Sequence, residues 1–151
     1  MQISEILNEK KNEIYSVVDT VMLCDVIEKL NDKNVGAMIV LDSSGKVAGI
    51  VTERDILKKA CPRHLNSDTT SVTSVMTPRE QLIVGTPEDT ISYAMNVMTT
   101  KRVRHLPIFR HETLLGIVSI GDIVKIFLEQ SEAEIEKLRK HIRNPYGINA
   151  L

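Results

Sequence analysis

The sequence predicts an α+β fold in which two tandem β-α-β-β-α repeats pack with pseudo-twofold symmetry, followed by a C-terminal helix. Residues 49–55 (GIVTERD) recur as residues 116–122 (GIVSIGD), so each copy runs from a glycine through aliphatic residues and a hydroxyl to an aspartate. The similarity extends upstream, where residues 35–41 (VGAMIVL) match residues 103–109 (VRHLPIF). Because a segment that returns at nearly constant spacing indicates a duplicated structural unit, we expect two equivalent halves that pack face to face with a cleft between them.

Each half is predicted to contain the same elements in the same order: a short helical segment, a brief strand, an amphipathic helix, two strands joined by a hairpin, and a last helix. Apolar residues recur at helical spacing in the amphipathic helices, and polar turns separate the paired strands. Some strands are apolar on both faces, so we expect helices to cover the sheet. The elements are predicted at residues 3–7, 15–18, 23–30, 37–41, 47–51 and from Thr52 in the first half, and at residues 72–76, 82–85, 91–98, 105–109, 114–118 and from Ser119 in the second.

The chain divides into repeat 1 (residues 1–60), a polar linker (61–71), repeat 2 (72–130) and a C-terminal segment (131–151). A unit of about 60 residues is only marginally stable alone, so we expect the two repeats to form one module.

Residues 131–134 (SEAE) predict the start of a separate helix, because serine is a preferred N-cap and acidic residues favour the first turn. Ile135, Leu138 and Ile142 give that helix a narrow apolar stripe. The stripe packs either on its own domain or against the same helix of a second copy of the chain. We expect a homodimer. The tail at residues 144–151 is expected to be loosely held.

Composition excludes several functional classes. The formal net charge of the 151 residues is -1, which gives no electrostatic support for nucleic-acid or membrane binding. The chain contains no apolar run near 18 residues and its N-terminus lacks a signal-peptide core, so we expect a cytoplasmic protein with no membrane contact. The histidines and cysteines show no metal-ligand spacing and no catalytic arrangement, so we expect no metal, no catalytic residues and no enzymatic activity.

The repeated hydroxyl and aspartate have two interpretations. Thr52 with Asp55, and Ser119 with Asp122, fit a capping box that satisfies free N–H groups at a helix start. Alternatively, the helix N-terminus and the hydroxyl favour phosphate, while the carboxylate accepts hydrogen bonds from the two vicinal hydroxyls of a ribose. The residues suit a nucleotide, although the sequence leaves both interpretations open.

The pattern Gly-hydrophobic-x-Thr/Ser-x-x-Asp, closing each of two β-α-β-β-α units, resembles the CBS domain, which occurs as tandem pairs called Bateman modules. Residues 75–78 (VMTP) and 102–108 (RVRHLPI) agree with this resemblance, which covers roughly residues 3–130. The end of the chain around residues 141–143 is similar to small stand-alone bacterial CBS-domain proteins. The resemblance implies that the chain binds an adenosine nucleotide as a regulatory ligand, such as AMP, ADP, ATP, NAD(H) or S-adenosylmethionine.

Carried over by position, the resemblance implies that Asp55 and Asp122 hold the ribose, and that the hydroxyls of Thr52 and Ser119 contact ribose or phosphate. Adenine is expected to insert between aliphatic strands. The candidate pocket residues are Val17, Ala37, Ile50, Ile83, His105, Pro107 and Ile117.

Three arginines are candidate phosphate ligands: Arg54, Arg102 and Arg104. Arg104 replaces Gly36 of the first copy within a strand expected to be buried, where a charged side chain requires a partner. That partner is either a phosphate, which a guanidinium binds in bidentate fashion, or an acidic side chain. Arg102 has a second interpretation, as a cation that complements the C-terminal dipole of the preceding helix.

These observations favour a regulatory module that senses an adenosine nucleotide and acts on a partner protein that the sequence does not identify. One alternative is a ligand-independent interaction or oligomerisation module, in which the repeated hydroxyl and aspartate cap the helices and bind no ligand. A second alternative is an enzyme that acts on the bound nucleotide.

Overall fold

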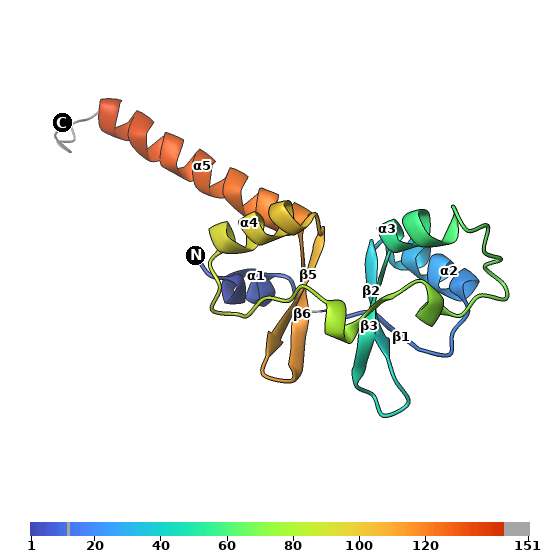
Figure 1. The fold of residues 1–151 in the computed structure, drawn as a ribbon. Coiled ribbons are helices and arrows are strands. Elements are labelled where there is room, and N and C mark those ends of the chain that lie inside the picture. The colour runs from blue at the N-terminus through green and yellow to red at the C-terminus, as the bar shows by residue number, and fades with distance from the viewer. Residues whose placement is uncertain (12, 144–151) are drawn as a thin grey trace.

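The computed structural model describes residues 1–11 and 13–143, and the predicted tail lies outside these residues (Figure 1). The predicted α+β fold is confirmed. The first half contains α1 (Ile3–Glu9), β1 (Ser16–Val18), α2 (Leu23–Lys33), β2 (Ala37–Leu41), β3 (Val47–Thr52), α3 (Glu53–Asp55) and the π-helical turn η1 (Ile56–Ala60). The second contains the 3₁₀ turn η2 (Val72–Ser74), β4 (Thr77–Pro78), the 3₁₀ turn η3 (Arg79–Gln81), α4 (Ile91–Lys101), β5 (His105–Arg110), β6 (Thr113–Ser119) and α5 (Ile120–Arg143).

The strands form a four-stranded sheet in the order β1-β2-β3-β4 and a separate two-stranded sheet of β5 and β6. β1 runs parallel to β2, whereas the β2–β3, β3–β4 and β5–β6 pairs are antiparallel. β4 follows the linker, yet it pairs with β3 of repeat 1, where Gly49 lies opposite Pro78. The larger sheet is therefore built from both repeats.

The strand predicted at residues 82–85 is reduced to a single parallel bridge between Gly85 and Ile108. The Gly85 N–H donates to the carbonyl of Pro107, and the Phe109 N–H donates to the carbonyl of Gly85, both at 2.9 Å. Extending this ladder towards Ile83 would require an N–H donor at residue 107. Proline has none, which explains why the ladder stops.

The segments that lead into the two repeats cross over to the opposite halves. Figure 1 shows α1 beside α4 and the β5–β6 hairpin, and the buried side chains Ile3, Ile6 and Leu7 belong to the same core cluster as Ile91 of α4. Conversely, Val72 packs in the core of the first half. Because each core contains residues from the other repeat, the two halves depend on one another for burial.

The two sheets meet through an apolar interface. Ala37, Ile39 and Ile50 on β2 and β3 form a buried cluster against which Leu114 and Ile117 of β6 pack. This interface packs the two repeats against one another.

The prediction of a separate helix starting at Ser131 is wrong, because α5 runs without interruption from Ile120 to Arg143. Residues 120–143 contain no proline, and their one glycine, Gly121, lies in the first turn. A serine inside a helix costs only a few tenths of a kcal/mol, so Ser131 does not end the helix. Figure 1 shows the second half of α5 projecting away from the body.

Candidate functional site

Two clefts lie at the boundary between the repeats. The large cleft has a volume of about 710 Å³ and contains Thr52 and Asp55 in its lining. The small cleft has a volume of about 370 Å³ and contains Ser119 in its lining. The duplicated motif therefore places one hydroxyl at each cleft, as expected for two pseudo-symmetric sites.

In the large cleft, Thr52 is the N-cap of α3 and its hydroxyl oxygen accepts the N–H of Asp55 at 3.0 Å. Asp55 Oδ2 in turn accepts the N–H of Thr52 at 3.0 Å and the Thr52 hydroxyl at 3.1 Å. Asp55 Oδ1 accepts the hydroxyl of Thr77 at 3.2 Å and forms an ion pair with Lys59 at 2.9 Å. One carboxylate oxygen thus caps the helix, and the other meets two polar side chains that line the cleft.

Beside the small cleft, Asp122 Oδ2 accepts the Ser119 N–H at 2.7 Å, and the Asp122 N–H donates to Ser119 Oγ at 3.2 Å. Lys10 donates to Asp122 Oδ2 at 2.7 Å and to the carbonyl of Ile117 at 3.2 Å. Partial burial alone would raise the pKa of Asp122, but the hydrogen bonds from Lys10 and Ser119 outweigh burial and hold it below its usual value.

The capping arrangement is therefore present in both copies. It occupies Oδ2 of each aspartate, so a sugar hydroxyl would be accepted mainly by Oδ1. At Asp55 that oxygen already faces the donors Thr77 and Lys59, whereas Oδ1 of Asp122 accepts no hydrogen bond from the described residues. Capping and ligand binding are compatible at both positions, because they use different oxygens.

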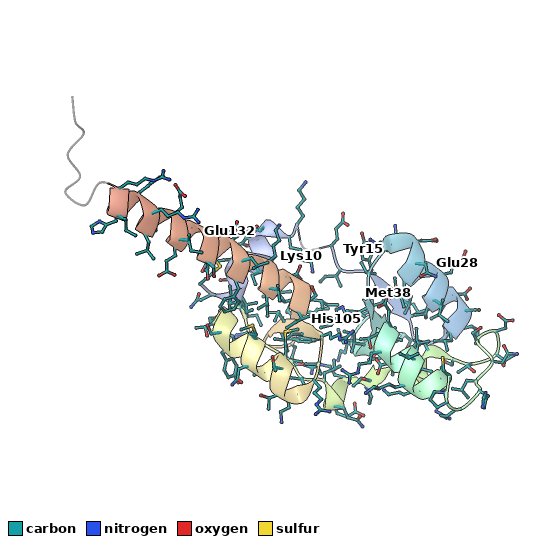
Figure 2. All side chains as sticks on the ribbon, turned by 90° about the horizontal axis from the view of Figure 1, so that it is seen from above. Lys10, Tyr15, Glu28, Met38, His105 and Glu132 are labelled. Atoms are coloured by element: carbon teal, nitrogen blue, oxygen red, sulfur yellow. The ribbon has the colours of Figure 1, made fainter. Side chains whose placement is uncertain are left out.

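His105 belongs to the walls of both clefts, and Figure 2 shows it between the two halves of the molecule. A Cβ atom at Gly36 would lie 3.0 Å from His105 Cε1 and 3.1 Å from Nε2. Repeat 1 therefore carries glycine at the position where repeat 2 carries Arg104, because the imidazole ring of the opposite repeat fills this space.

Burial lowers the pKa of His105, and the positive charges of Lys10 and Arg104 act in the same direction. The carboxylates of Glu53 and Asp122 oppose this shift only in part. The half-buried ring is consequently favoured in its neutral form.

This lowered pKa predicts a pH-dependent stability. In the unfolded chain His105 has a pKa near 6.5. Below that pH the unfolded chain binds a proton at His105, whereas the folded protein binds it only at lower pH. The free energy of unfolding should fall as the pH decreases from about 6.5 towards the lower folded pKa. Urea unfolding at several pH values should show this slope in the parent and a flatter one in His105→Asn.

The matched control for this prediction is His111→Asn, in the exposed turn between β5 and β6. His111 has a positive φ of 54°, which asparagine adopts readily. The control should retain the slope of the parent, and equal slopes in all three proteins would rule out His105 as its source.

The structure distributes the predicted adenine residues between the clefts. Ile50, Ile83 and Pro107 line the large cleft, whereas Ala37 and Ile117 line the small one. Val17 requires a correction, because its buried side chain packs with Val26 and other residues of the first core and is not among the residues that line either cleft. Alternate residues of a strand face opposite sides, and the face of β1 that carries Val17 is directed into this core.

The three predicted phosphate residues, Arg54, Arg102 and Arg104, all line the large cleft. The expectation that Arg104 is buried in a strand is wrong: it precedes β5 and is exposed. The argument that burial requires a partner for it therefore does not apply. Arg102 is the left-handed C-cap of α4, and its carbonyl accepts a hydrogen bond from Arg54 Nη1 at 2.8 Å.

The large cleft is strongly basic, and the small cleft is not. Six lysine and arginine side chains and two acidic ones line the large cleft, compared with one of each in the small cleft. A cleft with a surplus of cations attracts and retains anionic groups. The two pseudo-symmetric sites therefore differ in their preference for charged ligands.

Sequence reasoning missed several residues of the clefts. Lys59 could have been found, since it lies four residues after Asp55 on the same helical face. Thr77 belongs to the VMTP segment, although nothing local indicates that its hydroxyl reaches Asp55. Lys10 carries no local signal, because its contact with Asp122 spans almost the whole chain.

The fold is that of two tandem units with crossed-over leading segments and paired clefts, which defines a Bateman-type module. The family model described as "CBS domain" matches residues 3–61 and 72–129. The chain belongs to the CBS-domain family and contains a tandem pair of CBS domains.

Similar proteins of known sequence or structure also contain CBS domains. The chain is 36% identical over 124 residues to the mitochondrial CBS domain-containing protein CBSX3 of Arabidopsis thaliana, covering 81% of this chain and 60% of that protein's length. A protein with CBS domains from Burkholderia ambifaria superimposes with a TM-score of 0.79 at 32% identity, over 85% of this chain and 95% of that one.

Two more distant structures contain ligands. The CBS domain protein PAE2072 of Pyrobaculum aerophilum, in complex with AMP, has a TM-score of 0.70 at 24% identity, over 81% of this chain and 89% of that one. The CBS domain pair of protein MJ0100, in complex with 5-methylthioadenosine and S-adenosylmethionine, has a TM-score of 0.72 at 19% identity, over 86% and 98%. At these identities the likeness establishes the fold.

Within residues 1–11 and 13–143, no helix has both the length and the apolar character needed to cross a lipid bilayer. The same residues contain no group of three or more His, Cys, Asp and Glu side chains placed to hold a metal ion.

Proposed function

We propose that this CBS pair is a regulatory module that binds an adenosine nucleotide in the large cleft and passes its state to a partner protein. The observation that carries the proposal is the gathering, in one cleft of about 710 Å³, of the Asp55 carboxylate, apolar walls and six basic side chains. These three kinds of surface match the ribose, the base and the phosphates of a nucleotide.

The ribose would be held by Asp55 Oδ1, with the hydroxyls of Thr52 and Thr77 beside it. Adenine would insert between the apolar side chains Ile50, Ile83 and Pro107, which come from both repeats. Strand backbones can recognise the edge of a base without a polar side chain. A nucleotide bound in this way would bridge the repeats.

The phosphates would face Arg54, Arg102 and Arg104. Guanidinium groups bind phosphate oxygens in bidentate fashion, and the surplus of cations favours anionic nucleotides. AMP, ADP, ATP and NAD(H) are therefore the principal candidates. S-adenosylmethionine remains a candidate because the structure of the MJ0100 CBS pair contains it, together with 5-methylthioadenosine. The PAE2072 structure contains AMP.

The small cleft is proposed as a second site with a different affinity. Its ribose residue would be Asp122, with Ser119 as the hydroxyl partner and Ala37 and Ile117 beside the base. Lys10 occupies one oxygen of Asp122, and no arginine contributes to the lining. This site would favour adenosine ligands with little negative charge.

Regulation would follow from the position of the ligand between the repeats. A ligand shifts an equilibrium between two conformations only by its preference for one of them, and a nucleotide that touches both repeats is sensitive to their relative packing. We propose a non-catalytic, cytoplasmic homodimer as the functional form, with the regulated protein still to be identified. The alternative of a ligand-independent interaction module is favoured by the helix caps that Asp55 and Asp122 form.

Equilibrium titration distinguishes these functions. The purified chain should be titrated by calorimetry with AMP, ADP, ATP, NADH and S-adenosylmethionine, and its melting temperature should be measured at saturating ligand. We expect at least one of them to bind and to raise the melting temperature, since a ligand that binds only the folded state stabilises it. Failure of all five at millimolar concentration would favour the interaction module, and conversion of a bound nucleotide to product would show an enzyme.

A ligand series tests the phosphate residues. Arg104→Ala should weaken ATP and ADP more than adenosine, by about 1.5–3 kcal/mol for each lost charged hydrogen bond. Lys46→Ala removes a lysine from the β2–β3 hairpin turn, outside both clefts, and should leave every affinity unchanged. Equal losses for adenosine and ATP in Arg104→Ala would contradict a phosphate role.

A further inference from the structure

The distal half of α5 presents an apolar stripe that the body of the molecule does not cover. Every residue from 128 to 143 is exposed, and Figure 2 shows Glu132 on the part of the helix that extends beyond the body. Leu128 is 60%, Leu138 57% and Ile142 77% exposed. An isolated helical extension of this length is marginally stable in water, so its large apolar side chains indicate a packing partner.

The stripe is not a continuation of the face that packs on the body. At its start, α5 buries Ile123 and Ile126, and the next positions on that face are polar: Gln130, Glu134 and Lys137. The exposed apolar residues lie on a neighbouring face, because consecutive helical residues are rotated by about 100°. The body therefore offers no surface to this stripe.

The spacing of the stripe is that of a coiled coil. Its positions alternate in steps of four and three residues, which is the heptad pattern in which a and d positions form a seam. Isoleucine at a and leucine at d favour a parallel two-stranded coiled coil, and the last part of the seam meets this rule with Ile135, Leu138 and Ile142. The a positions are Leu128, Ile135 and Ile142, and the d positions are Val124, Ser131 and Leu138.

The charges beside the seam match a second copy of the same helix. In this register Glu134 is a g position and Arg139 is the e position five residues later. In a parallel two-stranded coiled coil, the g residue of one helix lies beside the following e residue of the other. Glu134 of each chain would therefore meet Arg139 of its partner, which gives two opposite-charge pairs related by the twofold axis.

We propose that α5 forms a parallel, two-stranded coiled coil with α5 of a second copy of this chain. Residues 120–143 form a helix of 24 residues, about 36 Å long at 1.5 Å per residue. A parallel arrangement places both bodies at the same end of the rod. The seam is shorter than three heptads and contains Ser131, so the dimer dissociates on dilution.

Sedimentation velocity of the full chain over a wide concentration range tests the proposal. The parent should dimerise as its concentration increases, and Ile135→Glu should remain monomeric with an unchanged melting profile of the body, because Ile135 is 48% exposed and belongs to no core cluster. A parent that stays monomeric at every concentration would overturn the proposal. A dimer that survives Ile135→Glu would also overturn it, since the interface would then lie elsewhere.

Charge reversal tests the parallel register. Glu134→Arg alone and Arg139→Glu alone each place like charges across the seam twice, and each should raise the dissociation constant by roughly tenfold, equivalent to about 1.4 kcal/mol. A mixture of the two variants should form a heterodimer as tight as the parent, because both pairs are then opposite in charge. The controls Glu136→Arg and Lys140→Glu make the same charge changes away from the seam and should have no effect. A mixture that stays as weak as the single variants would exclude the parallel arrangement.

Discussion

Replacing Asp55 with asparagine is expected to weaken the binding of an adenosine nucleotide by about 1–3 kcal/mol, through the loss of charged hydrogen bonds to the ribose. Asparagine has nearly the same shape, and its carbonyl oxygen can still accept the N–H of Thr52 that Asp55 accepts at 3.0 Å. The helix cap is thereby largely retained, while the negative charge is lost. Titration calorimetry on the parent and the variant measures the change directly.

Two comparisons separate the ribose role from capping. Asp55→Asn also removes the ion pair with Lys59, so its melting temperature without ligand should fall, and both affinities should be measured at a temperature where parent and variant are fully folded. Asp122→Asn is the matched change at the pseudo-symmetric position and should leave the large cleft unaffected. If Asp55→Asn bound nucleotide as tightly as the parent, the aspartate would be a cap and nothing more.

Replacing Gly49 with alanine is expected to lower the free energy of unfolding by about 3 kcal/mol or more, as an overpacked site does when backbone must move. A Cβ atom at this position would lie 2.3 Å from the carbonyl oxygen of Thr77 and 3.1 Å from Met76 Sδ. β4 would have to separate from β3, where Gly49 faces Pro78. Urea unfolding measures the loss, and nucleotide affinity should also fall because Thr77 leaves Asp55.

Gly121→Ala provides the matched control for this substitution. The nearest atom to its Cβ would be Ser119 Oγ at 3.6 Å, an ordinary contact. Alanine is a better helix former than glycine by up to about 1 kcal/mol, so the free energy of unfolding should stay the same or increase. A similar loss in both variants would mean that the close approach of β4 to β3 is unimportant.

Most of the fold could be predicted because the sequence contains it twice. The repeated segments fixed the strand pairs and the helix starts at Thr52 and Ser119, which the structure places at the N-termini of α3 and α5. Two elements of the structure differ from the prediction, for reasons that the spacing of apolar residues does not indicate. Pro107 removes a donor on the neighbouring strand and so limits the strand at residues 82–85, and Ser131 lies inside a helix that nothing interrupts.

The candidate site was only partly predictable. The aspartates and hydroxyls follow from a local motif; Thr52, Asp55 and Ser119 line the clefts, and Asp122 lies beside the small one. One cleft is basic and the other nearly neutral, and this difference depends on which side chains of the opposite repeat line each cleft. Lys10 beside Asp122 and His105 beside Gly36 are tertiary contacts, so local spacing could not indicate them.

The central claim is that Oδ1 of the Asp55 carboxylate, the oxygen that faces Thr77 and Lys59, accepts the hydroxyls of a ribose in the large cleft. Crystals grown with AMP or ATP test it most directly. The account predicts nucleotide density between the repeats, with the ribose diol on Asp55, the base beside Ile50 and Pro107, and the phosphates towards Arg102 and Arg104. Density that shows Asp55 bound only to Thr52, Thr77 and Lys59, beside a cleft that contains water at saturating nucleotide, would contradict it.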